Sequence, residues 1–298
     1  MNAKIPLTYA IFVNHHLIKI IPMSYDKSVS DHYLHGNLLN AIEAALPALG
    51  KTTTTVTIAD LAPVDEFHIG GRQATDHLLA QLNFSEHANL LDVGCGLGGA
   101  ARYIASQFNN SVTGIDLAQE YIDTGNALCR WLKLENKISL VQGSALDMPF
   151  NNNTFDGGYM LHVGMNIEDK ATLFAQIHRV LKPGATFAVY DIMRQSDGEL
   201  TYPVPWATTS STSKLATSEQ YQQMLTQAGF TLIKATNRHD FSVDFFNQLR
   251  AKIAADDGPP PLGLHTLMQQ SAAQKVKNMV ANIGKGIIAP VEMIVQKP

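Results

Sequence analysis

The densest group of candidate ligand-binding residues lies at positions 90–99, whose sequence is LLDVGCGLGG. Apolar residues lead into Asp92, and Gly94, Gly96 and Gly99 then match the pattern G-x-G-x-x-G. This pattern indicates a buried strand, a tight turn and a helix whose free N–H groups face a ligand. A nucleotide-like ligand is the natural occupant of such a turn.

Asp92 helps to decide which nucleotide fits. In dinucleotide-binding folds the same turn holds a pyrophosphate, so a carboxylate two residues before the first glycine would repel that ligand. A carboxylate suits a ligand that carries an ammonium group and no phosphate. S-adenosylmethionine, with its amino-acid tail, sulfonium and adenosine, is such a ligand. A plain glycine-rich turn in which Asp92 acts as a cap is the structural alternative.

Two further polar positions follow the next two predicted strands. Asp116 stands where a carboxylate can accept hydrogen bonds from ribose hydroxyls, or cap the helix that begins at Ala118. The Ser144 hydroxyl and the Ala145 N–H could contact an adenine edge, with a simple turn as the alternative. NAD enzymes use the same ribose contact, so Asp116 supports a nucleoside without selecting the cofactor.

The elements that position these residues alternate between strand and helix, as their apolar periodicity indicates. Short apolar runs predict strands at 90–93, 112–115, 138–141, 155–161, 185–191, 230–235 and 287–295. The order predicts an α/β fold with a doubly wound, seven-stranded, Rossmann-like sheet of parallel strands. A helical insertion is expected at about 240–284, before the last strand.

The composition excludes several classes of protein. Of the 298 residues, 45% are hydrophobic and 16% are charged, as in ordinary globular proteins. The net charge of −4 gives no sign of the excess positive charge that is typical of nucleic-acid-binding proteins. The apolar runs at 5–13 and 17–21 are shorter than the roughly 20 residues of a membrane span. The presence of only two cysteines argues against a disulfide framework and favours a cytoplasmic location, and no His/Asp/Glu cluster suggests a metal.

As a set, these motifs resemble the class I S-adenosylmethionine-dependent methyltransferases. The residues that carry the resemblance are Asp92-x-Gly94-x-Gly96, Asp116, the loop 143–150 with Met148-Pro149-Phe150, and Phe155-Asp156. His68-Ile69-Gly70, Asp31-His32-Tyr33 and His35-Gly36 are similar to small-molecule enzymes of the sarcosine/dimethylglycine N-methyltransferase and tocopherol C-methyltransferase type. The resemblance covers residues 60–240.

The resemblance implies S-adenosylmethionine as the cofactor and a small-molecule methyl acceptor. The cofactor-binding candidates are His68, Arg72, Asp92, Gly94, Cys95, Gly96, Asp116, Leu117, Ser144, Ala145 and Leu161. In this type of enzyme the N-terminal segment covers the cofactor, so Tyr25, Tyr33, His68 and Arg72 become candidates for its methionine end. Many relatives carry Asp at the position of Ser144. Sarcosine-like enzymes carry an acidic residue at that of His162, which argues against an amino-acid acceptor here.

The resemblance also implies a division of the chain. We expect an N-terminal extension at 1–22, with Met23 as an alternative start, and a helical cap at 23–85. The S-adenosylmethionine-binding methyltransferase domain then spans 86–298. A homodimer is left open.

His162 is the candidate catalytic base, because an imidazole with an unperturbed pKa near 6.5 can accept a proton at neutral pH. A histidine that is merely hydrogen-bonded is the alternative. The substrate-binding candidates are Tyr33, Asn166, Asp191, Arg194 and Trp206. Asp191 and Arg194 would line the substrate pocket or form a surface ion pair. Tyr202 and Trp206 would form an aromatic wall that suits a cationic substrate, or would pack in the core.

Three functions compete. The first is transfer of a methyl group to a nitrogen, oxygen or carbon nucleophile by in-line displacement, for which the protein supplies alignment and a dry pocket. The second is NAD-dependent oxidoreduction, which the glycine pattern favours and Asp92 opposes. The third is a non-catalytic module that binds S-adenosylmethionine.

Overall fold

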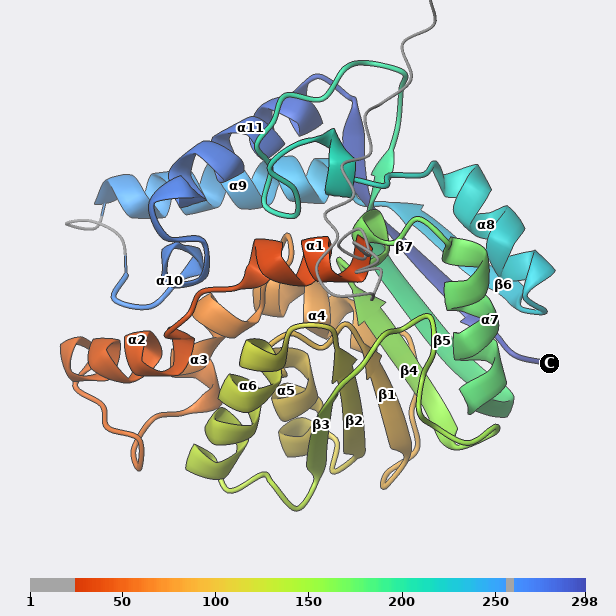
Figure 1. Ribbon diagram of the computed structural model, residues 1–298, viewed down its shortest axis with the longest axis horizontal. Helices are drawn as coiled ribbons and strands as arrows, with labels where there is room; N and C mark the ends of the chain where they lie inside the picture. Colours follow the sequence, from red (N-terminus) through yellow and green to blue (C-terminus); the bar gives the residue numbers. More distant parts are fainter. Residues whose placement is uncertain (1–24, 256–259) are drawn as a thin grey trace, which may run out of the picture.

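The computed structural model describes residues 25–255 and 260–298, so the predictions for residues 1–22 and for Met23 lie outside the described residues. A seven-stranded sheet runs through the molecule with strand order β3-β2-β1-β4-β5-β7-β6 (Figure 1). Its strands are β1 (Asn89–Val93), β2 (Ser111–Asp116), β3 (Ile138–Gln142), β4 (Phe155–Leu161), β5 (Leu181–Arg194), β6 (Thr231–Asn237) and β7 (Ile288–Gln296). The predicted seven-stranded Rossmann-like sheet is confirmed.

The sheet is mixed, so the prediction of an all-parallel sheet is wrong at one strand. β1, β2, β3, β4 and β5 pair in parallel, whereas β7 runs antiparallel to both β5 and β6. The helices between β6 and β7 lie over the carboxyl ends of the parallel strands (Figure 1). The helix before β7 ends at Gly284 and β7 begins at Ile288, so β7 enters the sheet from the end where that helix lies.

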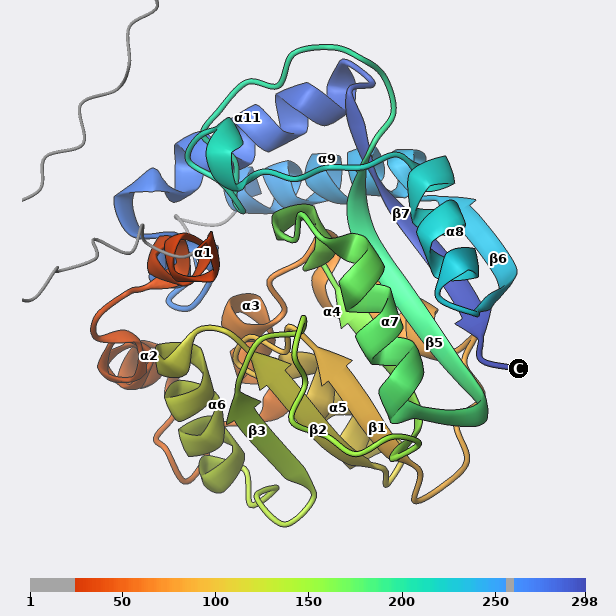
Figure 2. The same cartoon turned by 45° about the vertical axis from the view of Figure 1, so that its right-hand side comes forward.

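Helices cover both faces of the sheet and the carboxyl ends of its strands. The helices are α1 (Tyr25–Tyr33), α2 (Leu38–Ala45), α3 (Ile58–Asp65), α4 (Gly71–Leu79), α5 (Gly99–Gln107), α6 (Gln119–Trp131), α7 (Lys170–Val180), α8 (Ser218–Gln227), α9 (His239–Ala255), α10 (Leu264–Met268) and α11 (Ala272–Gly284). α1, α9, α10 and α11 lie over the carboxyl ends of the strands (Figures 1 and 2). α9, α10 and α11 fill the stretch expected for the helical insertion, and the division into domains stays a prediction.

The core has a layer on each face of the sheet. Leu91 and Val93 of β1 pack in one cluster with Phe174 of α7, whereas Leu90 packs in the other with Ile104 of α5. Since β1 is buried on both faces, its sequence is a short apolar run rather than an alternation, which is typical of central parallel strands. This burial holds the end of β1, and therefore Asp92, at the centre of the molecule.

Helix α3 is absent from the predicted elements. It begins with a capping box, in which the Asp60 N–H donates to Thr57 Oγ1 at 3.3 Å and the Thr57 N–H donates to Asp60 Oδ2 at 2.9 Å. The Thr57-x-x-Asp60 spacing is the signal that could have revealed it, although Pro63 inside the helix obscures the pattern. The helix matters because it ends at Asp65, beside the glycine turn.

Asp65 and Arg102 form a buried ion pair behind that turn. Arg102 Nη2 lies 2.6 Å from Asp65 Oδ2, and Arg102 Nη1 donates to the Leu97 carbonyl at 2.6 Å. A Cβ at Gly99 would collide with the Asp65 carbonyl oxygen, so glycine is needed for this close approach. Asp65 therefore lies against Gly99, the first residue of α5, close to where a dinucleotide fold would hold its pyrophosphate.

We expect Arg102→Met to lower the free energy of unfolding by about 3–5 kcal/mol, because it leaves the buried Asp65 carboxylate unpaired. Equilibrium urea unfolding measures this loss. The control is the double variant Arg102→Met/Asp65→Asn, which removes the unpaired charge and should recover most of the loss. A single variant as stable as the wild type would contradict the importance of the pair.

Candidate functional site

A cavity of about 1240 Å³ lies between the carboxyl ends of the strands and the helices α1, α9, α10 and α11. Ligand pockets typically measure about 300–1,000 Å³, so this one has room for a nucleoside-sized ligand and a second molecule. Each of the eleven residues predicted to bind the cofactor, from His68 to Leu161, lines the cavity. His162, Tyr33, Asn166 and Trp206 line it too.

Asp191 and Arg194 do not line the cavity, so their prediction as pocket residues is wrong. The fully buried Asp191 carboxylate accepts hydrogen bonds from the Tyr221 hydroxyl at 2.7 Å and the Ile192 N–H at 2.9 Å. Arg194 Nη1 donates to two carbonyls of the loop at 196–198. The physical reason is that β5 continues to Arg194, so both residues belong to the sheet rather than to a loop above it.

The glycine turn forms the floor of the cavity. Gly94 and Gly96 have φ values of +67° and +53°, which favour glycine. A Cβ at Gly96 would meet only Tyr121, at 4.0 Å, so this backbone lies open to a ligand. Asp116 accepts hydrogen bonds from the N–H groups of Gly96 and Ala118, both at 2.9 Å. Asp116 therefore joins the glycine turn to Ala118, the residue before α6, and its contact with a ribose stays a prediction.

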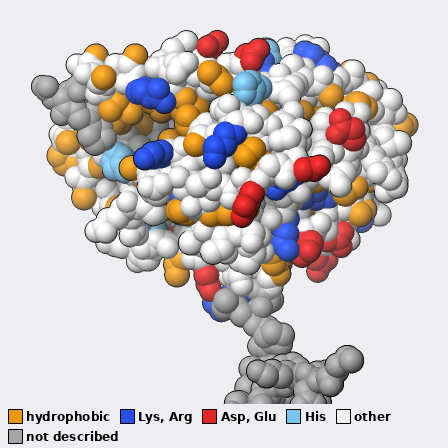
Figure 3. All heavy atoms as spheres, turned by 90° about the horizontal axis from the view of Figure 1, so that it is seen from above, with side chains coloured by type: hydrophobic (Ala, Val, Ile, Leu, Met, Phe, Trp, Pro, Cys, Tyr) orange, Lys and Arg blue, Asp and Glu red, His pale blue; other side chains and the backbone are white. Residues whose placement is uncertain are grey.

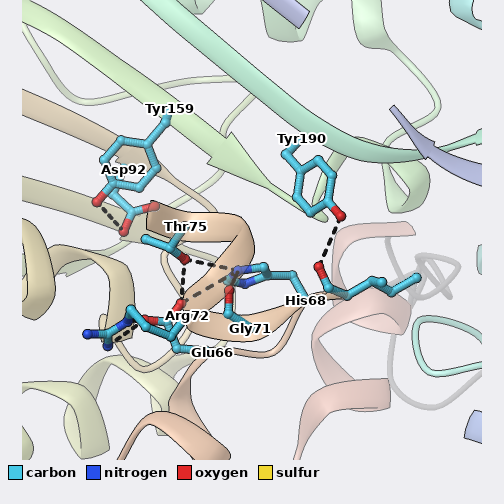
Figure 4. A network of polar contacts seen from close by, with 9 residues as sticks. Glu66, His68, Gly71, Arg72, Thr75, Asp92, Tyr159 and Tyr190 are labelled. Atoms are coloured by element: carbon cyan, nitrogen blue, oxygen red, sulfur yellow. Dashed lines mark hydrogen bonds and ion pairs between the residues drawn. The ribbon is translucent and has the colours of Figure 1, made fainter. Parts of the chain in front are cut away.

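Asp92 lies buried at the end of β1. The Tyr159 hydroxyl donates to Asp92 Oδ2 at 3.0 Å (Figure 4). Burial is the largest cause that raises the pKa of Asp92 to about 8, and the hydrogen bond from Tyr159 opposes it. A ligand ammonium group fits this position, because it would supply the positive charge that stabilises the ionised carboxylate.

A polar network lies beside Asp92 and centres on Glu66, which was not among the predicted residues. Glu66 accepts hydrogen bonds from Arg72 Nε at 2.7 Å and Thr75 Oγ1 at 2.6 Å (Figure 4). His68 Nε2 lies 3.0 Å from the Gly71 carbonyl. Burial lowers the pKa of His68, which favours the neutral ring. His68 and Arg72 thus line the cavity, but their side chains already contact the Gly71 carbonyl and Glu66. Their contact with a cofactor stays a prediction.

His162 presents an unpartnered nitrogen. Its Nε2 is buried and has no hydrogen-bond partner among the described residues. The backbone has a φ of +56°, a strained value for a residue with a side chain, and the N–H donates to the Tyr190 carbonyl at 2.7 Å. Burial, with a smaller effect of His68, holds the pKa of His162 well below its usual value. The imidazole at the cavity wall is therefore neutral, and its lowered pKa makes it a weaker base than a free imidazole.

The remaining predicted substrate residues hold α1 against the opposite wall. The Tyr33 hydroxyl donates to Asn166 Oδ1 at 2.7 Å, and Asn166 Nδ2 donates to the Trp206 carbonyl at 2.8 Å. The Trp206 indole N–H donates to Ser213 Oγ at 3.0 Å. Tyr202 is not among the residues that line the cavity and packs in an apolar cluster. The predicted aromatic wall therefore consists of Trp206 without Tyr202.

Residues 91–189 match a family model described as "Methyltransferase domain". A sterol 24-C-methyltransferase of Debaryomyces hansenii is 36% identical over 124 residues, which are 40% of this chain and 33% of that enzyme. The O-methyltransferase resE of Aspergillus sclerotiorum is 27% identical over 61% of this chain and 69% of its own length. The chain thus matches about a third of the length of the sterol enzyme.

A solved structure from Galdieria sulphuraria, assigned as a sarcosine dimethylglycine methyltransferase, superposes with a TM-score of 0.63 and 19% identity. The superposition covers 76% of this chain and 86% of that one. The resemblance to S-adenosylmethionine-dependent methyltransferases is therefore confirmed in fold, and in sequence over residues 91–189. Among the described residues, no helix is long and apolar enough to span a bilayer, and no group of side chains could hold a metal ion.

We expect Asp92→Asn to stabilise the cofactor-free protein increasingly as the pH rises. The carboxyl pKa rises from 3.8 to about 8 on folding, so between these values the unfolded chain binds fewer protons and the wild type loses stability. The loss is at most about 1.4 kcal/mol per pH unit. Thermal unfolding of both proteins at pH 5 and pH 8 measures it. An equal difference at the two pH values would contradict the raised pKa.

Proposed function

We propose that this chain, with its methyltransferase domain at residues 91–189, is an enzyme that transfers a methyl group from S-adenosylmethionine to a small, largely apolar molecule. One observation carries the proposal. The glycine floor offers the buried Asp92 carboxylate to a ligand, and a second carboxylate, that of Asp65, lies against the first residue of α5. This arrangement favours an ammonium group and disfavours a pyrophosphate, which argues against the NAD-dependent alternative.

S-adenosylmethionine, when bound, supplies an electrophilic methyl group on its sulfonium. The chain's own residues would hold it. Asp92 would bind the ammonium group, Asp116 the ribose hydroxyls, and Ala145 the adenine through its N–H. The cavity would align the acceptor with the methyl carbon and exclude water, which is the main contribution of a protein to this displacement.

His162 would act as the general base. Its free Nε2 faces no protein partner, and the neutral ring can take the proton that an oxygen or nitrogen nucleophile loses during transfer. The lowered pKa keeps the imidazole unprotonated through the neutral range. Catalytic activity, rather than mere binding of the cofactor, is the function that such a base supports.

The acceptor is proposed to be apolar because of the walls that α9, α10 and α11 contribute. The apolar residues there are Phe245, Phe246, Leu249, Ile253, Leu264, Leu267, Val276 and Met279. Among the described cavity residues of these helices, the ionisable ones are Lys252 and His265. On that side of the cavity a charged acceptor would therefore lose its hydration without gaining a buried counter-charge from these helices. A relative named as a sterol methyltransferase agrees with an apolar acceptor.

We also propose a cytoplasmic enzyme that binds no nucleic acid. Both cysteines are free and buried, which agrees with a reducing compartment. On the face seen in Figure 3, Lys and Arg side chains are interspersed with Asp and Glu rather than gathered in a basic stripe. The homodimer stays a prediction, which light scattering would test.

Isothermal titration calorimetry with S-adenosylmethionine and with NAD tests the cofactor. We expect binding of the first ligand and none of the second, because the Asp92 and Asp65 carboxylates beside the glycine turn would repel a pyrophosphate. Transfer of a labelled methyl group to a panel of phenols, amines and quinone precursors then identifies the acceptor. Tight binding of NAD alone would refute the proposal.

With an acceptor in hand, we expect His162→Gln to lower kcat by about 100-fold, the contribution typical of a general base. The affinity for S-adenosylhomocysteine should stay that of the wild type, because His162 holds no part of the cofactor in this account. His87→Gln, at an exposed position, is the matched control. Unchanged turnover in His162→Gln would remove this residue from the mechanism.

A further inference from the structure

The edge of the cavity beyond β3 carries a carboxylate from a distant part of the chain. Asp26 of α1 and Ser144 of the loop after β3 both line the cavity. Ser144 Oγ donates a hydrogen bond to Asp26 Oδ2 at 3.0 Å, across 118 residues of sequence. The pair is absent from the predicted site, because nothing in the local sequence of α1 points to a partner in that loop.

The order of the strands decides which part of a cofactor would reach this pair. β1, β2 and β3 are neighbours in the sheet, about 4.7–4.9 Å apart. Asp92 lies on β1, Asp116 ends β2, and residues 143–145 follow β3. If the ammonium group lies at Asp92 and the ribose at Asp116, as the proposed function has it, the base extends to Ser144. This inference therefore rests on the proposed function.

The Asp26 carboxylate can recognise the adenine base at that point through a hydrogen bond. An ionised carboxylate only accepts hydrogen bonds, and the exocyclic amine of adenine donates them. Ser144, whose side chain is a neutral hydroxyl, cannot supply this charge. In this chain the carboxylate comes instead from α1.

The position of Asp26 is held from both sides. The Tyr25 hydroxyl donates to the Asn166 carbonyl oxygen at 2.6 Å, and the Tyr33 hydroxyl donates to Asn166 Oδ1 at 2.7 Å. These contacts fix α1 across the cavity and leave the Asp26 carboxylate beside Ser144. Because α1 is already fixed, a contact between Asp26 and a ligand would cost little conformational entropy.

We propose that Asp26, oriented by Ser144, accepts a hydrogen bond from the exocyclic amine of adenine and sets the base specificity of the cofactor site. A 6-oxo base such as hypoxanthine would turn a carbonyl oxygen toward the carboxylate and be rejected. The helix α1 thereby contacts the cofactor itself, as well as covering it.

The test compares the calorimetric affinities of S-adenosylhomocysteine and S-inosylhomocysteine. We expect the wild type to prefer the adenine ligand by about 100-fold, because a polar site rejects an analogue that leaves its groups unpaired. Asp26→Asn should lower that ratio by about tenfold or more, because the amide can donate to the 6-oxo group. Asp31→Asn, on an exposed face of the same helix, should keep the wild-type ratio.

A second variant separates contact with the base from simple closure by α1. Asp26→Asn/Ser144→Asp returns a carboxylate from the loop and should restore the preference for adenine. An unchanged ratio in Asp26→Asn would overturn the inference, even if both affinities fell together. A wild type that binds neither ligand would instead refute the proposed cofactor.

Discussion

The buried contact between Asp65 and Arg102 holds the backbone on which the rest of the site depends. Arg102 neutralises Asp65 and also binds the Leu97 carbonyl, so one guanidinium joins α3 to the glycine turn. Asp116 holds the same turn from the cavity side, through the Gly96 N–H. The floor of the cavity is therefore held from two sides, and a carboxylate lies against Gly99, the first residue of the helix end that would hold a phosphate. This single arrangement separates the site from that of a dinucleotide enzyme.

Burial has opposite effects on the two groups that matter most for chemistry. It raises the pKa of Asp92 to about 8 and lowers that of His162, because a low dielectric disfavours whichever form is charged. The protein alone thus favours the neutral form of both groups. A cationic ligand changes the balance at Asp92, where it stabilises the carboxylate, and leaves His162 free to receive a proton. The buried Asp92 carboxyl destabilises the protein without ligand, and such a cost is expected where a residue is needed for ligand binding.

The sequence was sufficient to predict features that depend on residues close together in the chain. Buried strands are short apolar runs, so β4 was predicted with its observed bounds, and the glycine turn lines the cavity, where the sequence predicted a ligand site. The sequence could not predict contacts between segments that lie far apart in the chain. Asp26 contacts Ser144, 118 residues away, which only the fold brings near. Glu66 lies only six residues from Arg72, but no motif in the sequence marks that contact. Asp191 and Arg194 were misplaced because apolar periodicity does not show where β5 ends, and the same is true of the direction of β7.

The central claim is that a ligand ammonium group meets the Asp92 carboxylate on the glycine floor. Its most direct test is calorimetric titration of S-adenosylhomocysteine at pH 7, in buffers that differ in their enthalpy of ionisation. Because the Asp92 carboxyl has a pKa of about 8 in the ligand-free protein, it is mostly protonated at pH 7. Binding of the ammonium group should therefore release about one proton per molecule bound. Binding without proton release, or equal affinity in Asp92→Asn, would contradict the account.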